Sequence, residues 1–257
     1  MINQQKGLDF RPWIKRCPGS GPGATGLSGA VVIFPHAGGA AAAYRKLAIA
    51  LSANGVDAYT VQYPRRAERL AHPAPDTIEA LAADLFDAGP WDRVGPVRLF
   101  GHCMGALVAF EFARIAERLA DSRGAEVREL WASAGQAPST VAASQPAPTG
   151  DRELLADIVD LGGTDPRLLG DEDFLDLLLP AVRADYQAFN RYSCRTHVRI
   201  RADIHALGGR DDHRVAHDLL RGWQRHTDGA FTMTVFDGGH FYVDDHLDAV
   251  AQLVASA

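Results

Sequence analysis

The sequence has 257 residues, with 26 lysines and arginines against 32 aspartates and glutamates, giving a formal net charge of −6. A chain of this length can bury one large core, and we interpret residues 1–257 as a single domain. The acidic balance argues against nucleic-acid and polybasic membrane binders, and 3 cysteines without a CxxC pair argue against a disulfide scaffold or a structural zinc site. Residues 1–7 lack an apolar signal segment and no run reaches membrane-spanning length, so we expect a cytoplasmic protein.

Short apolar runs alternate with helical patterns through the first half of the chain. We predict strands at residues 12–17, 30–34, 56–62, 97–100 and 130–134, and helices at 41–52, 78–86 and 105–118. The run Ala30–Phe34 is apolar throughout, which is typical of a strand covered on both faces. Strands alternating with helices predict a mostly parallel central sheet flanked by helices, an α/β fold.

The alternation stops at about residue 136. Residues 136–193 contain a Pro/Ser/Ala-rich linker and helical patterns at 174–182 and 186–192, with no clear strand. We interpret them as a helical lid insertion, because pockets in open α/β sheets lie at the carboxyl ends of strands, where this segment leaves the sheet. A helical subdomain that only covers the sheet is the alternative. Strands at 204–207 and 231–236 and helices at 215–223 and 245–254 complete the predicted elements.

The segment Gly101-His102-Cys103-Met104-Gly105 lies between a predicted strand and a predicted helix. A nucleophile elbow, G-x-S-x-G, has this form, and its glycines are small because the strained elbow brings neighbouring backbone close. Cys103 stands where that motif has serine, and a thiolate can take the same role. Taken alone, the segment also fits a glycine-containing turn with a buried, inert cysteine.

An acid and a histidine follow Cys103 in the chain order of such hydrolases, each just after a predicted strand. We predict a triad of Cys103, Asp212 and His240, in which the histidine deprotonates the thiol and the aspartate orients the histidine. Asp211, which directly precedes Asp212, is the other candidate for the acid. Either aspartate is also suited to the N-terminus of the next helix, and His240 to a turn.

The loop His36-Ala37-Gly38-Gly39 follows the strand at 30–34 and is similar to the small-residue oxyanion loops of esterases. We predict that the backbone amides of Ala37 and Met104 stabilise the oxyanion. A glycine-rich strand-to-helix turn is the simpler interpretation of the same loop. The other histidines show no metal-ligand spacing and no phosphate-binding motif is present, so we expect no metal and no cofactor.

Together these motifs resemble the type II thioesterases, stand-alone α/β-hydrolases that accompany polyketide synthases and nonribosomal peptide synthetases. The similar segments, each followed by the family's pattern in parentheses, are Phe34–Gly39 with Tyr44 (FPHAGG), Gly101–Ala106 (GHSMGA), Leu179–Tyr186 (LLPxLRADF) and Gly238–Phe241 (GGHF). The resemblance covers nearly the whole chain. It implies an α/β-hydrolase that releases acyl or aminoacyl groups from the phosphopantetheine arm of acyl or peptidyl carrier proteins. We expect a monomer that binds no nucleic acid and no membrane. An acyltransferase or general esterase with the same triad, and a noncatalytic carrier-binding protein, are the alternatives.

Cys103 and the acid segment depart from the family pattern. The family has serine at the position of Cys103, which is either natural to this chain or a replacement. Attack by a thiolate on a carrier thioester exchanges one thioester for another, which makes acyl transfer more credible than it is for serine. Aligned on GGxxDPxV, the acid falls at Asp212, and His213 replaces proline.

A third departure lies in residues 63–69, which resemble the family's PGRxxR loop but have Arg65 where glycine is common. Carrier proteins are usually acidic, so Arg65, Arg66 and Arg69 are candidates for docking one. We favour an exposed loop of solvated charges instead.

Overall fold

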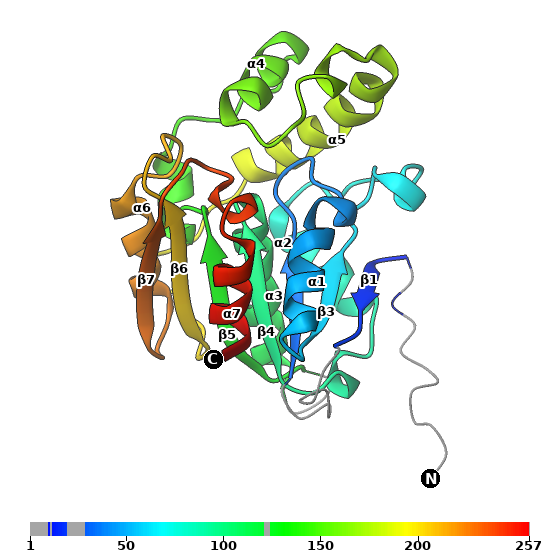
Figure 1. Cartoon of the computed structure of the whole chain (residues 1–257). Helices are drawn as coiled ribbons and strands as arrows, with labels where there is room; N and C mark the ends of the chain where they lie inside the picture. The colour runs from blue at the N-terminus through cyan, green and yellow to red at the C-terminus, as the bar shows by residue number, and fades with distance from the viewer. Residues whose placement is uncertain (1–9, 11, 20–28, 121–123, 257) are drawn as a thin grey trace.

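The computed structural model describes residues 10, 12–19, 29–120 and 124–256, so residues 1–7, where no signal segment was expected, lie outside the described part. Seven strands form one sheet in the order β1-β3-β2-β4-β5-β6-β7 (Figure 1). Strand β1 runs antiparallel to β3, and every other neighbouring pair is parallel. The strands are β1 (Ile14–Cys17), β2 (Ala30–Phe34), β3 (Asp57–Val61), β4 (Val97–His102), β5 (Val127–Ser133), β6 (Asp203–Gly209) and β7 (Phe231–Phe236). The prediction of a mostly parallel sheet is confirmed.

Helices cover both faces of the sheet, and each face has its own core (Figure 1). The α-helices are α1 (Arg45–Ala53), α2 (Ile78–Asp87), α3 (Met104–Arg118), α4 (Asp151–Leu161), α5 (Glu172–Asn190), α6 (His217–Arg221) and α7 (Leu247–Ser256). Helices α2 and α3 share one core with Val32 and Phe34, whereas α1 and α7 share the other with Val31 and Ile33. Alternate residues of β2 thus enter opposite cores, which explains why the whole strand is apolar.

Two predicted helices have 3-10 turns at their ends. The predicted helix at 41–52 opens as a 3-10 helix, Ala41–Tyr44, before α1 begins. The predicted helix at 215–223 consists of the short α6 followed by a 3-10 helix, Gly222–His226. Within the described residues, no helix combines the length and the apolar character that a membrane crossing requires.

Residues 136–193, which we call the helical insertion, separate β5 from β6 and contain α4 and α5 (Figure 1). Helix α5 continues through Pro180, so the two helical patterns predicted for this region form one helix. The helices share a small core of Leu154, Ile158, Val182 and Tyr186. Figure 1 shows both helices beyond the end of the sheet where β5 leads into the insertion.

The prediction of an exposed, solvated loop is wrong for Arg66 and Arg69. Both side chains are buried: Arg66 forms an ion pair with Asp185, and the guanidinium of Arg69 lies 3.5 Å from the ring centroid of Trp13. The counter-charge and the aromatic face compensate the cost of burying each cation. Arg65 is exposed, and its φ of 63° is the left-handed conformation for which glycine is favoured.

Candidate active site

Cys103 occupies a strained turn between β4 and α3. Its φ of 55° and ψ of −122° are unusual for a residue with a side chain. A Cβ atom on Gly101 would lie 2.4 Å from the carbonyl oxygen of Gly105, and one on Gly105 would lie 2.1 Å from that of Phe34. Both glycines are therefore required by close backbone approach, as the elbow motif predicts. The turn leaves Cys103 partly exposed at the wall of a cavity.

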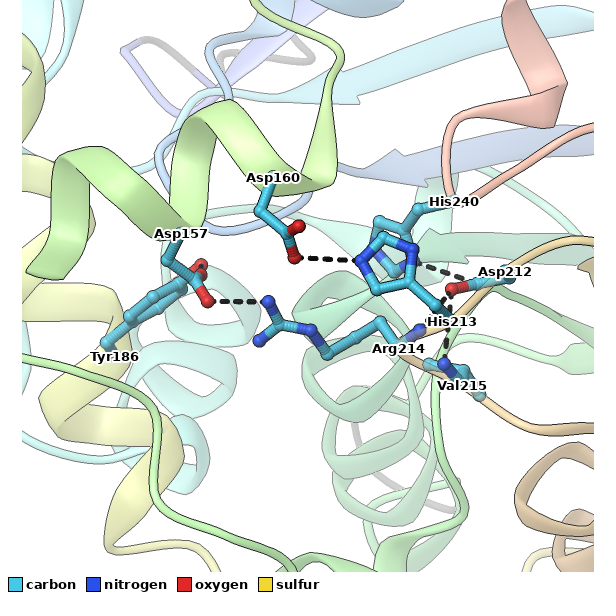
Figure 2. Close-up of polar contacts among 8 residues, drawn as sticks. All are labelled: Asp157, Asp160, Tyr186, Asp212, His213, Arg214, Val215 and His240. Atoms are coloured by element: carbon cyan, nitrogen blue, oxygen red, sulfur yellow. Dashed lines mark hydrogen bonds and ion pairs between the residues drawn. The ribbon is translucent and has the colours of Figure 1, made fainter.

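His240 and Asp212 form a buried pair, although 28 residues separate them in the chain. The Nδ1–H of His240 donates to Asp212 Oδ2 at 2.9 Å, and the other carboxylate oxygen accepts from the amides of Arg214 and Val215 at 2.9 and 3.1 Å (Figure 2). Asp212 thus binds the histidine and caps its own turn at once. Asp211 is exposed, and its amide donates to the carbonyl of Gly238.

The electrostatics of the pair favour a charged histidine. Burial disfavours the imidazolium of His240, but Cys103 and Asp212 outweigh burial and raise its pKa to about 10. Burial also opposes ionisation of Asp212, yet the contact with His240 lowers the pKa of that carboxyl. The second nitrogen, Nε2, is buried and no described residue meets hydrogen-bond geometry with it. Cys103 nevertheless raises the pKa of His240, foremost through its charge and also through a contact between the two side chains.

Among residues 36–39 of the loop after β2, one backbone amide has no acceptor. The amide of His36 donates to Tyr44 Oη, that of Gly38 to Asp185 Oδ2 at 2.7 Å, and that of Gly39 to the carbonyl of His36. Among these four described amides, only that of Ala37 has no protein acceptor. Met104 is the first residue of α3, so its amide has no partner within the helix.

A cavity of about 600 Å³ brings these groups together. Its walls include Cys103, Ala37, Met104 and the apolar side chains of Leu107 and Phe189. This size suits a small-molecule group rather than a water cluster. Within the described residues, no three His, Cys, Asp or Glu side chains gather in a way that could hold a metal ion.

Two further histidines surround the pair. The ring of His102 lies 5.4 Å from that of His240 and 6.1 Å from that of His36. Burial lowers the pKa of His102, and burial together with the charges of His240 and Arg66 lowers that of His36 to about 3. Both rings are neutral at physiological pH, so they pack beside His240 without competing for its proton.

Sequence reasoning missed Asp185 and Asp157 at this site, and both make contacts over long sequence distances. Asp185 lies 147 residues from Gly38, and Asp157 lies 57 residues from Arg214. No periodicity links such positions. The signal for Asp185 was its place in the segment similar to LLPxLRADF, where the family pattern also has aspartate.

Comparison with known proteins gives the family. A model of the thioesterase domain matches residues 30–257. This chain belongs to the thioesterase domain family. The solved type II thioesterase BorB, from the borrelidin biosynthetic cluster, is 38% identical and superposes with a TM-score of 0.79 over 95% of this chain and 96% of its own. The α/β-hydrolase fold of these thioesterases is the fold found here.

Two curated relatives extend the comparison. Phenyloxazoline synthase MbtB of Mycobacterium tuberculosis (strain H37Rv) is 62% identical over 99% of this chain, which spans only 17% of MbtB. Thioesterase PikA5 of Streptomyces venezuelae is 37% identical over 95% of this chain and 85% of PikA5. The thioesterase family is thus represented both by proteins of similar length and by a small part of a much longer synthase.

Proposed function

We propose that this thioesterase hydrolyses acyl or aminoacyl thioesters carried on the phosphopantetheine arm of carrier proteins, which clears stalled or misprimed synthase modules. One observation carries the proposal: the buried Asp212–His240 pair interacts with Cys103 beside a cavity that also presents the open amides of Ala37 and Met104. A nucleophile, an oriented base and two oxyanion donors are the parts that acyl transfer requires. The chain itself would supply no cofactor, because the substrate brings the phosphopantetheine.

Acylation requires the proton of the Cys103 thiol on Nε2 of His240, which is the charged form of the histidine that its raised pKa favours. The thiolate attacks the thioester carbonyl carbon, and the negative oxygen of the tetrahedral intermediate accepts hydrogen bonds from Ala37 and Met104. When the intermediate collapses, the bond to the phosphopantetheine sulfur breaks and His240 gives its proton to that sulfur. The acyl group is then bound to Cys103 as a thioester.

Deacylation repeats the same steps with water as the nucleophile. His240 takes a proton from water, the hydroxide attacks the acyl carbon, and the bond to the Cys103 sulfur breaks to release the free acid. The proton on His240 returns to the thiolate. Asp212 keeps its charge throughout and holds Nδ1–H, so that Nε2 faces the reaction.

The cavity and the relatives narrow the substrate class. The name of MbtB, 62% identical to this chain, describes a phenyloxazoline product. We propose an acyl group that combines an aromatic ring with a heterocycle as the first candidate. A cavity of about 600 Å³ with Phe189 and Leu107 in its walls can hold such a group, and the helical insertion above it would act as the lid that excludes water.

Acyl transfer is the second candidate, and Cys103 is the observation that favours it. Because the acyl-enzyme is itself a thioester, it retains the reactivity of the donor and can pass the acyl group to an amine or alcohol. Product analysis separates the candidates: an adduct of the added acceptor indicates transfer, and free acid indicates hydrolysis.

The test is a single incubation with an acyl-phosphopantetheinyl carrier protein, in which free acid and the intact mass of the enzyme are followed over time. We expect many turnovers of acid and a transient acyl adduct at Cys103. The variants Cys103→Ala and His240→Ala should each abolish turnover. A persistent stoichiometric adduct would instead indicate a transferase awaiting its acceptor. The absence of both free acid and adduct would refute the proposal for that substrate.

A further inference from the structure

Two carboxylates of α4 contact the side chains of the two residues that directly follow Asp212. Asp160 Oδ2 lies 2.8 Å from His213 Nε2, and Asp157 Oδ1 accepts a hydrogen bond from Arg214 Nη2 at 2.5 Å. Figure 2 shows both contacts beside the Asp212–His240 pair. The helical insertion is therefore attached to the loop that holds Asp212.

The two contacts differ in their surroundings. The side chains of Asp160 and His213 are 63% and 54% exposed, so water screens their interaction. Those of Asp157 and Arg214 are 12% and 34% exposed, and both residues line the same cavity as Cys103. Of these two contacts, the ion pair of Asp157 is therefore less screened by water and better able to hold α4 against the loop of Asp212.

Asp157 also binds a second helix of the insertion. Its Oδ2 accepts a hydrogen bond from Tyr186 Oη of α5 at 2.6 Å, while Oδ1 is occupied by Arg214. One carboxylate therefore joins α4, α5 and the loop after β6. Figure 2 shows Asp157 between these two partners.

The contact continues from Arg214 to the buried pair. The backbone amide of Arg214 donates to Asp212 Oδ1, and Asp212 Oδ2 accepts from His240. A displacement of Arg214 would move one of the donors that fix the Asp212 carboxylate. Because a carboxylate that orients a histidine acts through its geometry, small displacements are costly for the rate.

We propose that Asp157 is a positioning residue: it closes the helical insertion over the cavity and, through Arg214, holds Asp212 in the orientation that His240 requires. This inference rests on the proposed function, in which His240 is the base and Asp212 orients it. The closed position of the insertion and the alignment of Asp212 with His240 then occur together. A movement of α4 away from the cavity would weaken the hydrogen bond between Asp212 and His240.

The experiment compares Asp157→Asn with the matched control Asp160→Asn, since each variant removes one carboxylate charge from α4. The first readout needs no substrate: the low-field proton resonance of the His240 Nδ1–H reports its hydrogen bond to Asp212. We expect Asp157→Asn to shift or broaden this resonance and to speed hydrogen exchange in α4. Asp160→Asn should leave both unchanged.

The second readout is turnover of an acyl-carrier thioester. We expect Asp157→Asn to lower kcat by about 10- to 100-fold with a smaller change in KM, because alignment rather than binding is lost. Tyr186→Phe, which releases only α5 from Asp157, should speed exchange in α5 and leave the His240 resonance in place.

Either readout can overturn the proposal. An unchanged His240 resonance in Asp157→Asn, or equal effects of Asp157→Asn and Asp160→Asn, would show that the contact does not position the pair. If the wild-type chain releases no acid from any thioester while the resonance responds as expected, the proposed function fails and the link between Asp157 and the pair stands.

Discussion

Asp185 of α5 accepts a hydrogen bond from the amide of Gly38 at 2.7 Å, which places a buried carboxylate directly behind the loop that carries the Ala37 amide. The same oxygen pairs with the buried guanidinium of Arg66. A Cβ atom on Gly38 would lie 2.5 Å from Val182 of α5, so helix and loop are in direct contact. The helical insertion thus supports the loop that carries the proposed oxyanion donor Ala37, called the oxyanion loop below, as well as the loop of Asp212.

We predict that Asp185→Asn lowers both stability and kcat. Arg66 would remain buried without its counter-charge, which costs about 3 kcal/mol in the free energy of unfolding. The oxyanion loop would lose its fixed position, and kcat should fall by about 10-fold or more. Denaturant unfolding and turnover of an acyl thioester measure the two effects.

The control for this variant is Asp151→Asn in α4, whose partner is Arg183 of α5. Asp151 is 72% exposed, so its loss should change the free energy of unfolding by less than about 1 kcal/mol and leave kcat unaltered. Equal stability of the Asp185→Asn and Asp151→Asn proteins would contradict the role assigned to the buried ion pair.

The elbow gives a second prediction. In Gly105→Ala the new methyl would lie 2.1 Å from the carbonyl oxygen of Phe34 and 2.5 Å from that of Pro35, and neither backbone atom can move without shifting β2. We expect a loss of about 3 kcal/mol or more in the free energy of unfolding. Gly170→Ala is the matched control, since its methyl would meet nothing within 4 Å. If both variants unfold at the same denaturant concentration, the backbone of residue 105 does not approach the carbonyl of Phe34 as closely as in this structure.

The features predicted from the sequence are those that local patterns determine. The apolar run of Ala30–Phe34 identified a buried strand, and the glycines around Cys103 identified a strained turn, because each depends only on adjacent residues. Chain order then placed Asp212 and His240 at neighbouring strand ends, and parallel strands bring such ends to one edge. Local chemistry and topology together indicated the pair, and the resemblance of residues 208–215 to GGxxDPxV distinguished Asp212 from Asp211.

Contacts across the insertion could not be predicted in this way. The environment of Arg66 depends on Asp185, which lies 119 residues further along the chain. A charged residue with no partner nearby in the sequence is predicted to be exposed to solvent. The contacts of Asp157 with Tyr186 and Arg214 likewise require the packing of α4 against the sheet. Those positions follow from tertiary packing, for which the sequence has no repeating signal.

The third prediction concerns Cys103, the proposed nucleophile. Of the groups that raise the pKa of His240 to about 10, Cys103 is the largest, and a serine hydroxyl carries no charge at the same pH. In Cys103→Ser we therefore expect the pKa of His240 to fall towards its ordinary value of about 6.5. Titration of the His240 ring by NMR measures the change directly.

The same variant should alter the pH dependence of turnover. A serine needs a neutral histidine as its base, so the rate of Cys103→Ser should rise with pH until His240 has lost its proton. The cysteine form should keep its histidine protonated across neutral pH. An unchanged His240 titration in the serine variant would show that Cys103 is not the source of the raised pKa.

The fourth prediction concerns stability in acid. Burial, with the charges of His240 and Arg66, lowers the pKa of His36 to about 3 in the folded chain, and burial also lowers that of His102. Both histidines bind a proton more readily when unfolded, so stability falls as pH drops below about 6.5, by about 1.4 kcal/mol per pH unit for each ring that stays neutral in the folded chain. His240 has the opposite sign: its raised pKa favours folding below about 10, and that gain is complete at pH 6.5 and adds no slope below it.

Urea unfolding at pH 7.5, 6.0 and 5.0 tests this dependence, with His36→Gln as the comparison. The lowered pKa of Asp212 favours folding above its ordinary value of 3.8 and is lost only as pH falls below that value, so it adds no slope in this range. We expect the free energy of unfolding of the wild-type chain to fall steadily from pH 6.5 to 5.0. In His36→Gln it should fall less steeply, because one of the two histidines that cause the fall is missing. Identical slopes in the two proteins would mean that His36 takes up its proton in the folded state, which its packing against Phe241 and His102 should prevent.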